Sequence, residues 1–385
     1  MKFLIMLLVI ASVPTDAICV NIRNGIERYE LYRETLEGKR VGIVANHTSM
    51  VKGQHSVDFL RDKGVELVRI FSPEHGFRGE AEAGRLTGDY TDAKSHLKVI
   101  SLYGKKKKPT AKDLQGVDLM VFDIQDVGVR FYTYISTLHY VMEACAENGI
   151  PLLVMDRPNP NAFYVDGPVL QESYASFVGM HPVPVVYGMT IGEYALMING
   201  EGWLNGKRNC RLTVVPCENW NREEAVALSQ KPSPNLPDSV SVILYPSICF
   251  FEGTVVNEGR GTLTPFQVFG HPDLKNMSYS YIPRSIKGMS ESPKCEGQLC
   301  YGMDLRNEYR TIWKQKKINL AWLLLAYRNY EGEESFFTSF FDKLAGNDSL
   351  RKAILSGESE EEIRDSWQTD LQAFREIRVK YLLYR

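Results

Sequence analysis

Three consecutive segments, DLMVF at residues 118–122, TYISTLHYVMEACAEN at 133–148 and PLLVM at 151–155, decide the fold of this chain. The two short apolar runs predict buried strands, and the amphipathic segment between them predicts a helix that Gly149 ends. A strand, a helix and a second strand in this order form a right-handed unit in which the strands run parallel. The three segments therefore predict an α/β fold built on a parallel sheet.

Polar residues follow four predicted strands at the point where each strand ends. The strands at 40–45, 65–71, 118–122 and 151–155 lead into Asn46-His47-Thr48, Ser72-Pro73-Glu74-His75-Gly76, Asp123-Ile124-Gln125-Asp126 and Asp156-Arg157-Pro158-Asn159-Pro160. Open parallel sheets bind ligands in the crevice outside the carboxyl ends of their strands. The four clusters therefore predict a binding site at this edge of the sheet.

Length and proline content predict two domains. A chain of 385 residues exceeds the size of one typical hydrophobic core. The proline-rich segment at 231–237 reads as a hinge. We therefore expect one domain over 18–237 and a second, smaller one over 238–385, which ends in an amphipathic helix near 359–383.

The charge balance excludes broad nucleic-acid binding. Lys plus Arg number 45 and Asp plus Glu number 47, which gives a net charge of −2. Nucleic-acid binding requires a strongly basic surface. The one basic run, Lys105-Lys106-Lys107-Lys108, predicts a solvated loop between Gly104 and Pro109.

The first 17 residues are typical of a secretory signal peptide. Lys2 precedes an apolar stretch at 3–13 that is too short to span a bilayer, and Ala17 offers a cleavage site. No other segment is long and apolar enough for a stable membrane span. We expect an exported, periplasmic protein. A lipid anchor at Cys19 is less favoured, because Ile18 rather than a small residue precedes it.

Glu74 is the leading candidate for a catalytic carboxyl group. It follows a predicted strand and lies between Pro73, which fixes the backbone, and Gly76, which lets a ligand approach closely. With His75 beside it, such a carboxyl group can act as a general acid or base. The alternative is a structural carboxylate that caps a helix or pairs with Arg78.

Asp123 and Asp126 are candidates for a second catalytic group, because glycosidases commonly use two carboxyl groups. The alternative for Asp123 is a hydrogen bond to backbone at the strand end. Arg130 and Tyr132 follow closely and suit an anionic sugar, since a guanidinium pairs with a carboxylate and a ring packs on a pyranose. The alternative for this pair is a helix N-terminus with aromatic residues in the core.

Two further observations concern anions and cofactors. Glycines flank Glu258 and Arg260, so these residues form either a tight loop that contacts an anion or a hairpin with a salt bridge. The chain has no HExxH, no glycine-rich phosphate loop and no GxSxG. His47 and His75 lie in different predicted loops. The sequence therefore predicts no metal and no cofactor.

Several long motifs make the chain resemble the exo-β-N-acetylmuramidase family. They are GIVANHT at 42–48, SPEHGFRG at 72–79, FDIQDVGVRFYTY at 122–134, DRPNP at 156–160, and the stretch from FEGT at 251–254 to GRGT at 259–262. The resemblance implies a Rossmann-like catalytic domain, a smaller α+β domain and a cleft between them. It also implies a glycoside hydrolase that removes terminal, non-reducing MurNAc from peptidoglycan fragments such as MurNAc-GlcNAc, with Glu74 as its catalytic carboxyl group.

The resemblance also identifies substrate-binding candidates by their position in the motifs. They are Asn46, His47, His75, Gln125, Arg130, Tyr132, Asp156, Arg157, Asn159, Glu258 and Arg260. Arg130 or Arg260 is expected to hold the lactyl carboxylate of muramic acid. One departure is His271-Pro272-Asp273, where the family more often carries a small residue and an aromatic one around the proline.

Two other functions are compatible with the same residues. A non-catalytic periplasmic sugar-binding protein would also use arginine and aromatic residues, but it would not need Glu74. A metal-assisted hydrolase would use His47, His75 and the aspartates as ligands. The expected partners are peptidoglycan-derived muramyl saccharides, with no nucleic acid among them.

Overall fold

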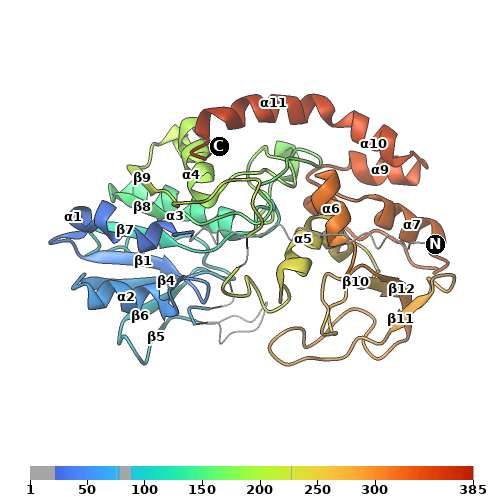
Figure 1. The fold of residues 1–385 in the computed structure, drawn as a ribbon, viewed down its shortest axis with the longest axis horizontal. Coiled ribbons are helices and arrows are strands. Elements are labelled where there is room, and N and C mark those ends of the chain that lie inside the picture. Colours follow the sequence, from blue (N-terminus) through green and yellow to red (C-terminus); the bar gives the residue numbers. More distant parts are fainter. Residues whose placement is uncertain (1–21, 75, 79–87, 227, 385) are drawn as a thin grey trace, which may run out of the picture.

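The computed structural model describes residues 22–74, 76–78, 88–226 and 228–384. The predicted signal peptide, Cys19 and His75 lie outside these ranges. Figure 1 shows a larger unit around one sheet and a smaller unit beside it. None of the helices in the described ranges has the length and apolar content that crossing a lipid bilayer requires.

The larger unit is built on a seven-stranded sheet in the order β5-β6-β4-β1-β7-β8-β9. The strands are β1 (Val41–Ala45), β4 (Leu67–Ser72), β5 (Tyr90–Thr91), β6 (Lys98–Ser101), β7 (Leu119–Asp123), β8 (Leu152–Met155) and β9 (Leu212–Val215). All neighbouring strands are parallel except β5 and β6. From β1 the chain first adds β4, β5 and β6 on one side of β1, and then adds β7, β8 and β9 on its other side. This order confirms the predicted Rossmann-like α/β fold.

Helices bury both faces of the sheet because its strands are apolar on both sides. In β7, Met120 and Phe122 belong to one core cluster and Leu119 and Val121 to the other. The first cluster packs against α3 (Tyr134–Asn148) and α4 (Ile191–Gly200), and the second against α2 (Ser56–Asp62). Helix α3 ends at Gly149, which adopts φ 66° as the predicted stop requires.

The smaller unit combines helices with a three-stranded antiparallel sheet in the order β10-β12-β11. Its elements are α5 (Ser239–Ile248), β10 (Val268–His271), β11 (Tyr279–Tyr281), β12 (Cys300–Asp304), α6 (Tyr309–Gln315), α7 (Ala321–Asn329), α8 (Phe341–Ala345) and α9 (Ser349–Leu355). One core cluster contains both Phe122 of the large sheet and Phe269 and Phe341 of this unit. The two units therefore share a continuous apolar core.

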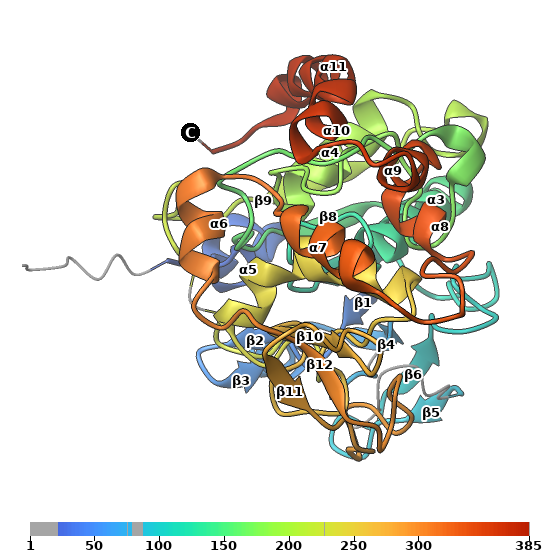
Figure 2. The same ribbon diagram turned by 90° about the vertical axis from the view of Figure 1, so that its right-hand side faces the viewer.

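The end of the chain differs from the single helix expected near 359–383. It forms α10 (Glu360–Ser366) and α11 (Gln368–Arg378), because the buried Trp367 between them adopts a non-helical backbone with φ −105° and ψ 1°. The two helices lie over the top of the molecule in Figure 1 and reach back to α4. Figure 2 shows them on the opposite side of α7 from the three-stranded sheet.

Arg130 joins the two units instead of facing a ligand, contrary to the sequence prediction. Its side chain is fully buried. Nη1 donates to the carbonyl oxygens of Pro168 and Val183 at 2.7 and 2.8 Å. Nη2 donates to those of Leu344 and Ala345, the last two residues of α8, at 2.8 and 2.7 Å. Both terminal nitrogens are thus occupied by backbone, so this guanidinium is not available to a sugar carboxylate.

We expect Arg130→Met to lower the free energy of unfolding by about 3 kcal/mol, because four buried carbonyl groups lose their donors. Urea unfolding followed by circular dichroism measures the change. A matched control is Arg33→Met, whose arginine side chain is 63% exposed, and it should change the same quantity by less than about 0.5 kcal/mol. Equal effects of the two substitutions would contradict the role of Arg130 as a clamp.

Candidate active site

A cavity of 600 Å³ lies where the two units meet. Its volume is typical of small-molecule binding sites. The larger unit contributes Glu74, Tyr103, Gly104, Lys107, Phe131, Tyr132, Thr133, Tyr134, Phe177 and Val178 to its lining, and the remainder of the chain contributes Ser233, Leu236, Tyr245, Glu252, Arg260 and Phe266. Three residues predicted from sequence thus meet in one cavity, namely Glu74, Tyr132 and Arg260.

The register of the sheet sets the position of Glu74. Ser72 at the end of β4 pairs with Ser101 at the end of β6. Glu74 and Tyr103 each follow two residues later, which brings them side by side, and the Tyr103 hydroxyl hydrogen-bonds the carboxyl group. From the other side, Thr133 at the start of α3 donates its hydroxyl to Glu74 Oε2 at 3.4 Å.

The surroundings of Glu74 favour its protonated form. Burial raises the pKa of this carboxyl group, and the hydrogen bond from Tyr103 and the charge of Arg260 oppose that rise only in part. A carboxyl group whose pKa is raised is better suited to donate its proton to a leaving group. Gly76, with φ 75°, provides the tight turn that directs the chain away after Glu74.

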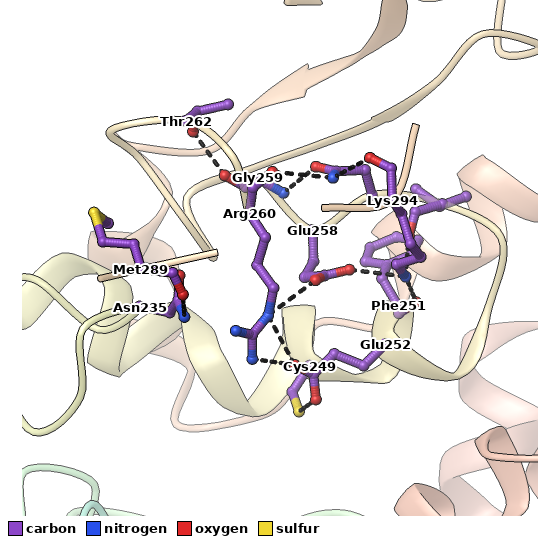
Figure 3. Close-up of polar contacts among 12 residues, drawn as sticks. Asn235, Cys249, Phe251, Glu252, Glu258, Gly259, Arg260, Thr262, Met289 and Lys294 are labelled. Atoms are coloured by element: carbon purple, nitrogen blue, oxygen red, sulfur yellow. Dashed lines mark hydrogen bonds and ion pairs between the residues drawn. The ribbon is translucent and has the colours of Figure 1, made fainter. Parts of the chain in front are cut away.

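Arg260 lies between two carboxylates on the opposite wall (Figure 3). Its Nη2 is 2.5 Å from Glu252 Oε1, and its Nε is 3.1 Å from Glu258 Oε1. Lys294 Nζ is 2.8 Å from Glu258 Oε2. The guanidinium also lies 5.1 Å from the ring centroid of Phe266. The ion pair expected in this glycine-flanked loop therefore forms, and it is largely shielded from solvent.

Glu258 does not line the cavity, although the motifs placed it among the substrate-binding candidates. Its side chain is 2% exposed and is enclosed by its two cationic partners. It therefore supports Arg260 from behind. Glu252 is the acidic residue of this cluster that reaches the cavity, and it shares that space with Glu74.

Asp123 lies outside the cavity lining, contrary to its predicted role as a second catalytic group. Its carboxylate forms a forked ion pair with Arg157, with Nε 2.7 Å from Oδ1 and Nη2 3.0 Å from Oδ2. The two side chains are 0% and 2% exposed. An ion pair closed in this way holds the ends of β7 and β8 together and cannot reach a substrate beside Glu74.

Asp126 is also enclosed beneath the cavity. Its Oδ2 accepts hydrogen bonds from the Gly128 amide at 2.7 Å and from the Tyr187 hydroxyl. Burial raises the pKa of this carboxyl group to about 6. Asp126 was predicted as a second catalytic group, and in this structure it does not belong to the lining of the cavity that contains Glu74.

The polar residues that follow β1, β7 and β8 hydrogen-bond to one another and to nearby backbone. Asn46 Oδ1 accepts from the amide and hydroxyl groups of Thr48, and Gln125 Nε2 donates to the Pro158 carbonyl at 2.7 Å. Asn159 Nδ2 donates to the Met189 carbonyl at 2.7 Å. These contacts fix the loops that follow β1, β7 and β8, and they leave Asn46 and Asn159 buried.

Two remaining candidates make comparable contacts. His47 Nε2 lies 2.8 Å from the Lys231 carbonyl oxygen, so it ties the proline-rich segment to the loop after β1. Asp156 is fully buried and accepts from the Thr190 hydroxyl at 2.7 Å and the Tyr384 hydroxyl at 2.5 Å. Burial raises the pKa of Asp156 to about 7. His47 and Asp156 therefore hold neighbouring segments of the protein together.

A second cavity, of 430 Å³, lies at the edge formed by β1, β7 and β8. Thr48, Gln125 and Arg157 are part of its lining, and Glu74 is not. This is the crevice that the strand order alone would favour. Gln125 and Arg157 are thus separated from the cavity that holds Glu74. Within the part of the chain that the structure describes, no three His, Cys, Asp or Glu side chains are placed to hold a metal ion.

Sequence reasoning missed several residues of the first cavity. Tyr103 and Lys107 follow β6, a strand that was not predicted, although the run KVIS at 98–101 is a usable signal. Glu252 stands in the FEGT motif that was noted without a role. Tyr245 comes from α5, where nothing in the sequence distinguishes it from a core residue.

The chain is similar to one protein family over most of its length. A model described as exo-β-N-acetylmuramidase NamZ, N-terminal, matches residues 41–240, and the corresponding C-terminal model matches residues 243–384. The peptidoglycan β-N-acetylmuramidase NamZ of Bacillus subtilis is 41% identical over 374 residues, which cover 92% of this chain and 89% of the relative.

Two solved structures of DUF1343 family proteins from Bacteroides fragilis share the fold. The first has a TM-score of 0.88 and 44% identity, and the match covers 95% of this chain and 99% of that one. The second has a TM-score of 0.78 and 30% identity, with 95% and 100% covered. The similarity therefore extends over both units.

Asp123→Asn should lower the free energy of unfolding by about 3 kcal/mol, because it leaves Arg157 buried without its counter-charge. The matched control is Asp118→Asn on the same strand region. Asp118 forms a similar forked pair with Arg40, but these side chains are 35% and 50% exposed, so the expected loss is below about 1 kcal/mol. Chemical unfolding of both variants measures the difference. An Asp123→Asn protein of unchanged stability would contradict the structural role.

Proposed function

The chain belongs to the exo-β-N-acetylmuramidase NamZ family, and we propose that it removes the terminal, non-reducing MurNAc from peptidoglycan fragments such as MurNAc-β-1,4-GlcNAc. The observation that carries the proposal is Glu74, a carboxyl group with a raised pKa at the wall of a sugar-sized cavity. The NamZ relative, whose name identifies a peptidoglycan β-N-acetylmuramidase, supports the same substrate class.

Glu74 acts as the general acid in this proposal. It donates its proton to the glycosidic oxygen as the bond from that oxygen to the anomeric carbon of MurNAc breaks. Water supplies the hydroxyl group of the released MurNAc, its remaining proton restores the acid form of Glu74, and GlcNAc leaves with the proton that Glu74 gave. Tyr103 and Thr133 hold the carboxyl group in place through their hydroxyl groups.

In this proposal Glu252 is the second carboxyl group, a role that the sequence analysis gave to Asp123 or Asp126. It lines the same cavity as Glu74, and Arg260 holds one of its oxygens at 2.5 Å. Positive charge develops at the anomeric carbon in the transition state of glycoside hydrolysis. A fixed carboxylate on that side of the cavity stabilises this charge. The two carboxyl groups thus have different roles because their neighbours differ.

Aromatic side chains provide the surface on which the sugar ring packs. Tyr132 is fixed by its hydroxyl group, which donates to the Pro232 carbonyl at 2.6 Å. Tyr245 and Phe266 meet edge to face at 4.9 Å between ring centroids. Apolar faces of pyranose rings pack well on such surfaces. A sugar-binding protein would also need these rings, but it has no use for a buried carboxyl group whose pKa is raised, which favours the enzyme.

We also propose that the protein is exported to the periplasm. Residues 1–17 are typical of a secretory signal peptide. Peptidoglycan fragments of the proposed kind arise outside the cytoplasmic membrane. Fractionation of cells that produce the full chain tests this location, and accumulation of the uncleaved chain in the cytoplasm would contradict it.

Glu74→Gln should lower kcat on MurNAc-β-1,4-GlcNAc by about a thousandfold or more, because glutamine cannot donate the proton. Mass spectrometry of the free sugars released by protein that begins at residue 18 measures the rate. Glu66→Gln, which removes an exposed carboxylate from the turn before β4, serves as the control and should retain wild-type turnover. Near-wild-type activity of Glu74→Gln would remove Glu74 from the acid role.

The raised pKa of Glu74 also has a consequence for stability. The folded state holds this proton more tightly than the unfolded state, whose carboxyl pKa is near the ordinary value of 4.5. Stability is therefore lost as the pH rises through the folded-state pKa. Glu74→Gln removes this loss, so its melting temperature should exceed that of the wild type by more at about pH 7 than at about pH 4. A variant that is less stable than the wild type at neutral pH would contradict the account.

A further inference from the structure

The composition of the basic run at 105–108 predicted a solvated loop. In the structure, however, its lysines have different environments. Lys106 Nζ lies 3.4 Å from Asp89 Oδ1, and Lys108 Nζ lies 2.8 Å from Glu143 Oε2. These two lysines are thus neutralised by carboxylates that do not line the cavity. The lysine between them has a different environment.

Lys107 faces the cavity that contains Glu74. Its Nζ lies 4.0 Å from the ring centroid of Phe177, which lines the same cavity. A ring in this position attracts an ammonium group and holds the flexible side chain in place. Among the carboxylates that the structure describes, none forms an ion pair with Lys107. Within the described ranges, its ammonium group is therefore held by a ring and is not neutralised by a carboxylate.

Arg260, the other cation of the cavity, is already neutralised. It pairs with Glu252 and Glu258, and Lys294 completes a cluster of two cations and two anions. A substrate carboxylate that bound Arg260 would have to compete with Glu252 at 2.5 Å. An incoming anion therefore gains more from Lys107, whose ammonium group has no carboxylate partner among the described residues.

We propose that Lys107 binds the lactyl carboxylate of MurNAc and so makes the cavity select muramic acid over N-acetylglucosamine. This inference rests on the proposed function and deepens it. The lactyl ether is the only group that distinguishes the two sugars, and it carries a full negative charge at neutral pH. A lysine recognises such a group as a point charge. A sugar whose lactyl carboxyl group is converted to an amide loses this contact.

The test compares two chromogenic substrates on the same protein. They are 4-nitrophenyl β-MurNAc and its derivative in which the lactyl carboxyl group is a neutral methyl amide. Wild-type protein should prefer the acid by about thirtyfold in kcat/KM, and Lys107→Met should reduce that preference to about threefold or less, mainly through KM for the acid. Lys107→Arg should restore most of the preference. The ratio is measured within one preparation, so a reduced folded fraction cancels.

Lys105→Met is the matched control, because it removes an exposed lysine from the same run. It should keep the wild-type preference. An unchanged preference in Lys107→Met, with the wild type active, would overturn the assignment of Lys107 and leave the proposed function intact. A loss of preference in Arg260→Lys but not in Lys107→Met would overturn it in favour of the arginine. Wild-type protein that hydrolyses neither substrate would overturn the proposed function and this inference together.

Discussion

The burial of one guanidinium, that of Arg130, fixes the contact between the two units on which the cavity depends. A buried charge is tolerated only where hydrogen bonds replace its hydration, and here carbonyl groups of both units supply them. The residue directly precedes Phe131, Tyr132 and Thr133, which line the cavity. The position of these lining residues therefore depends on the packing of α8, which lies more than 200 residues later in the chain. This coupling explains why the cavity belongs to neither unit alone.

The ionisable groups that line the cavity differ in the partners that surround them. Burial raises the pKa of Glu74, while Arg260 and its carboxylate partners form a balanced cluster on the facing wall. Lys107 is left with an aromatic ring and no carboxylate partner in the described ranges. An uncharged saccharide would find no partner for that lysine, and an anionic one would. The distribution of charge thus favours an acidic sugar, while the raised pKa of Glu74 favours proton donation to the bond that is cleaved.

The sequence predicted β1, β4, β7 and β8 of the large sheet and the end of α3, because apolar runs and a C-terminal glycine are local signals, but it did not predict β6. Glu74 and Arg260 were also identified, since proline and glycine beside them restrict the backbone to turns. Asp123, Asp126 and Arg130 were assigned to the site because a polar residue at a strand end has the same local pattern whether it binds a ligand or another side chain. The partners that decide between these roles, such as Tyr187 for Asp126 and Leu344 for Arg130, lie far away in the sequence. Lys107 was overlooked for the same reason, because its neighbours alone resemble a solvated run.

The central claim is that the saccharide binds between the two units and not in the second cavity at the edge of β1, β7 and β8. A crystal structure of the Glu74→Gln protein soaked with uncleaved MurNAc-β-1,4-GlcNAc tests it most directly. The account predicts the disaccharide against Tyr132 and Tyr245, with its glycosidic oxygen beside position 74 and its lactyl carboxylate beside Lys107. A disaccharide bound instead beside Thr48 and Gln125, in the crevice that the strand order favours, would contradict it.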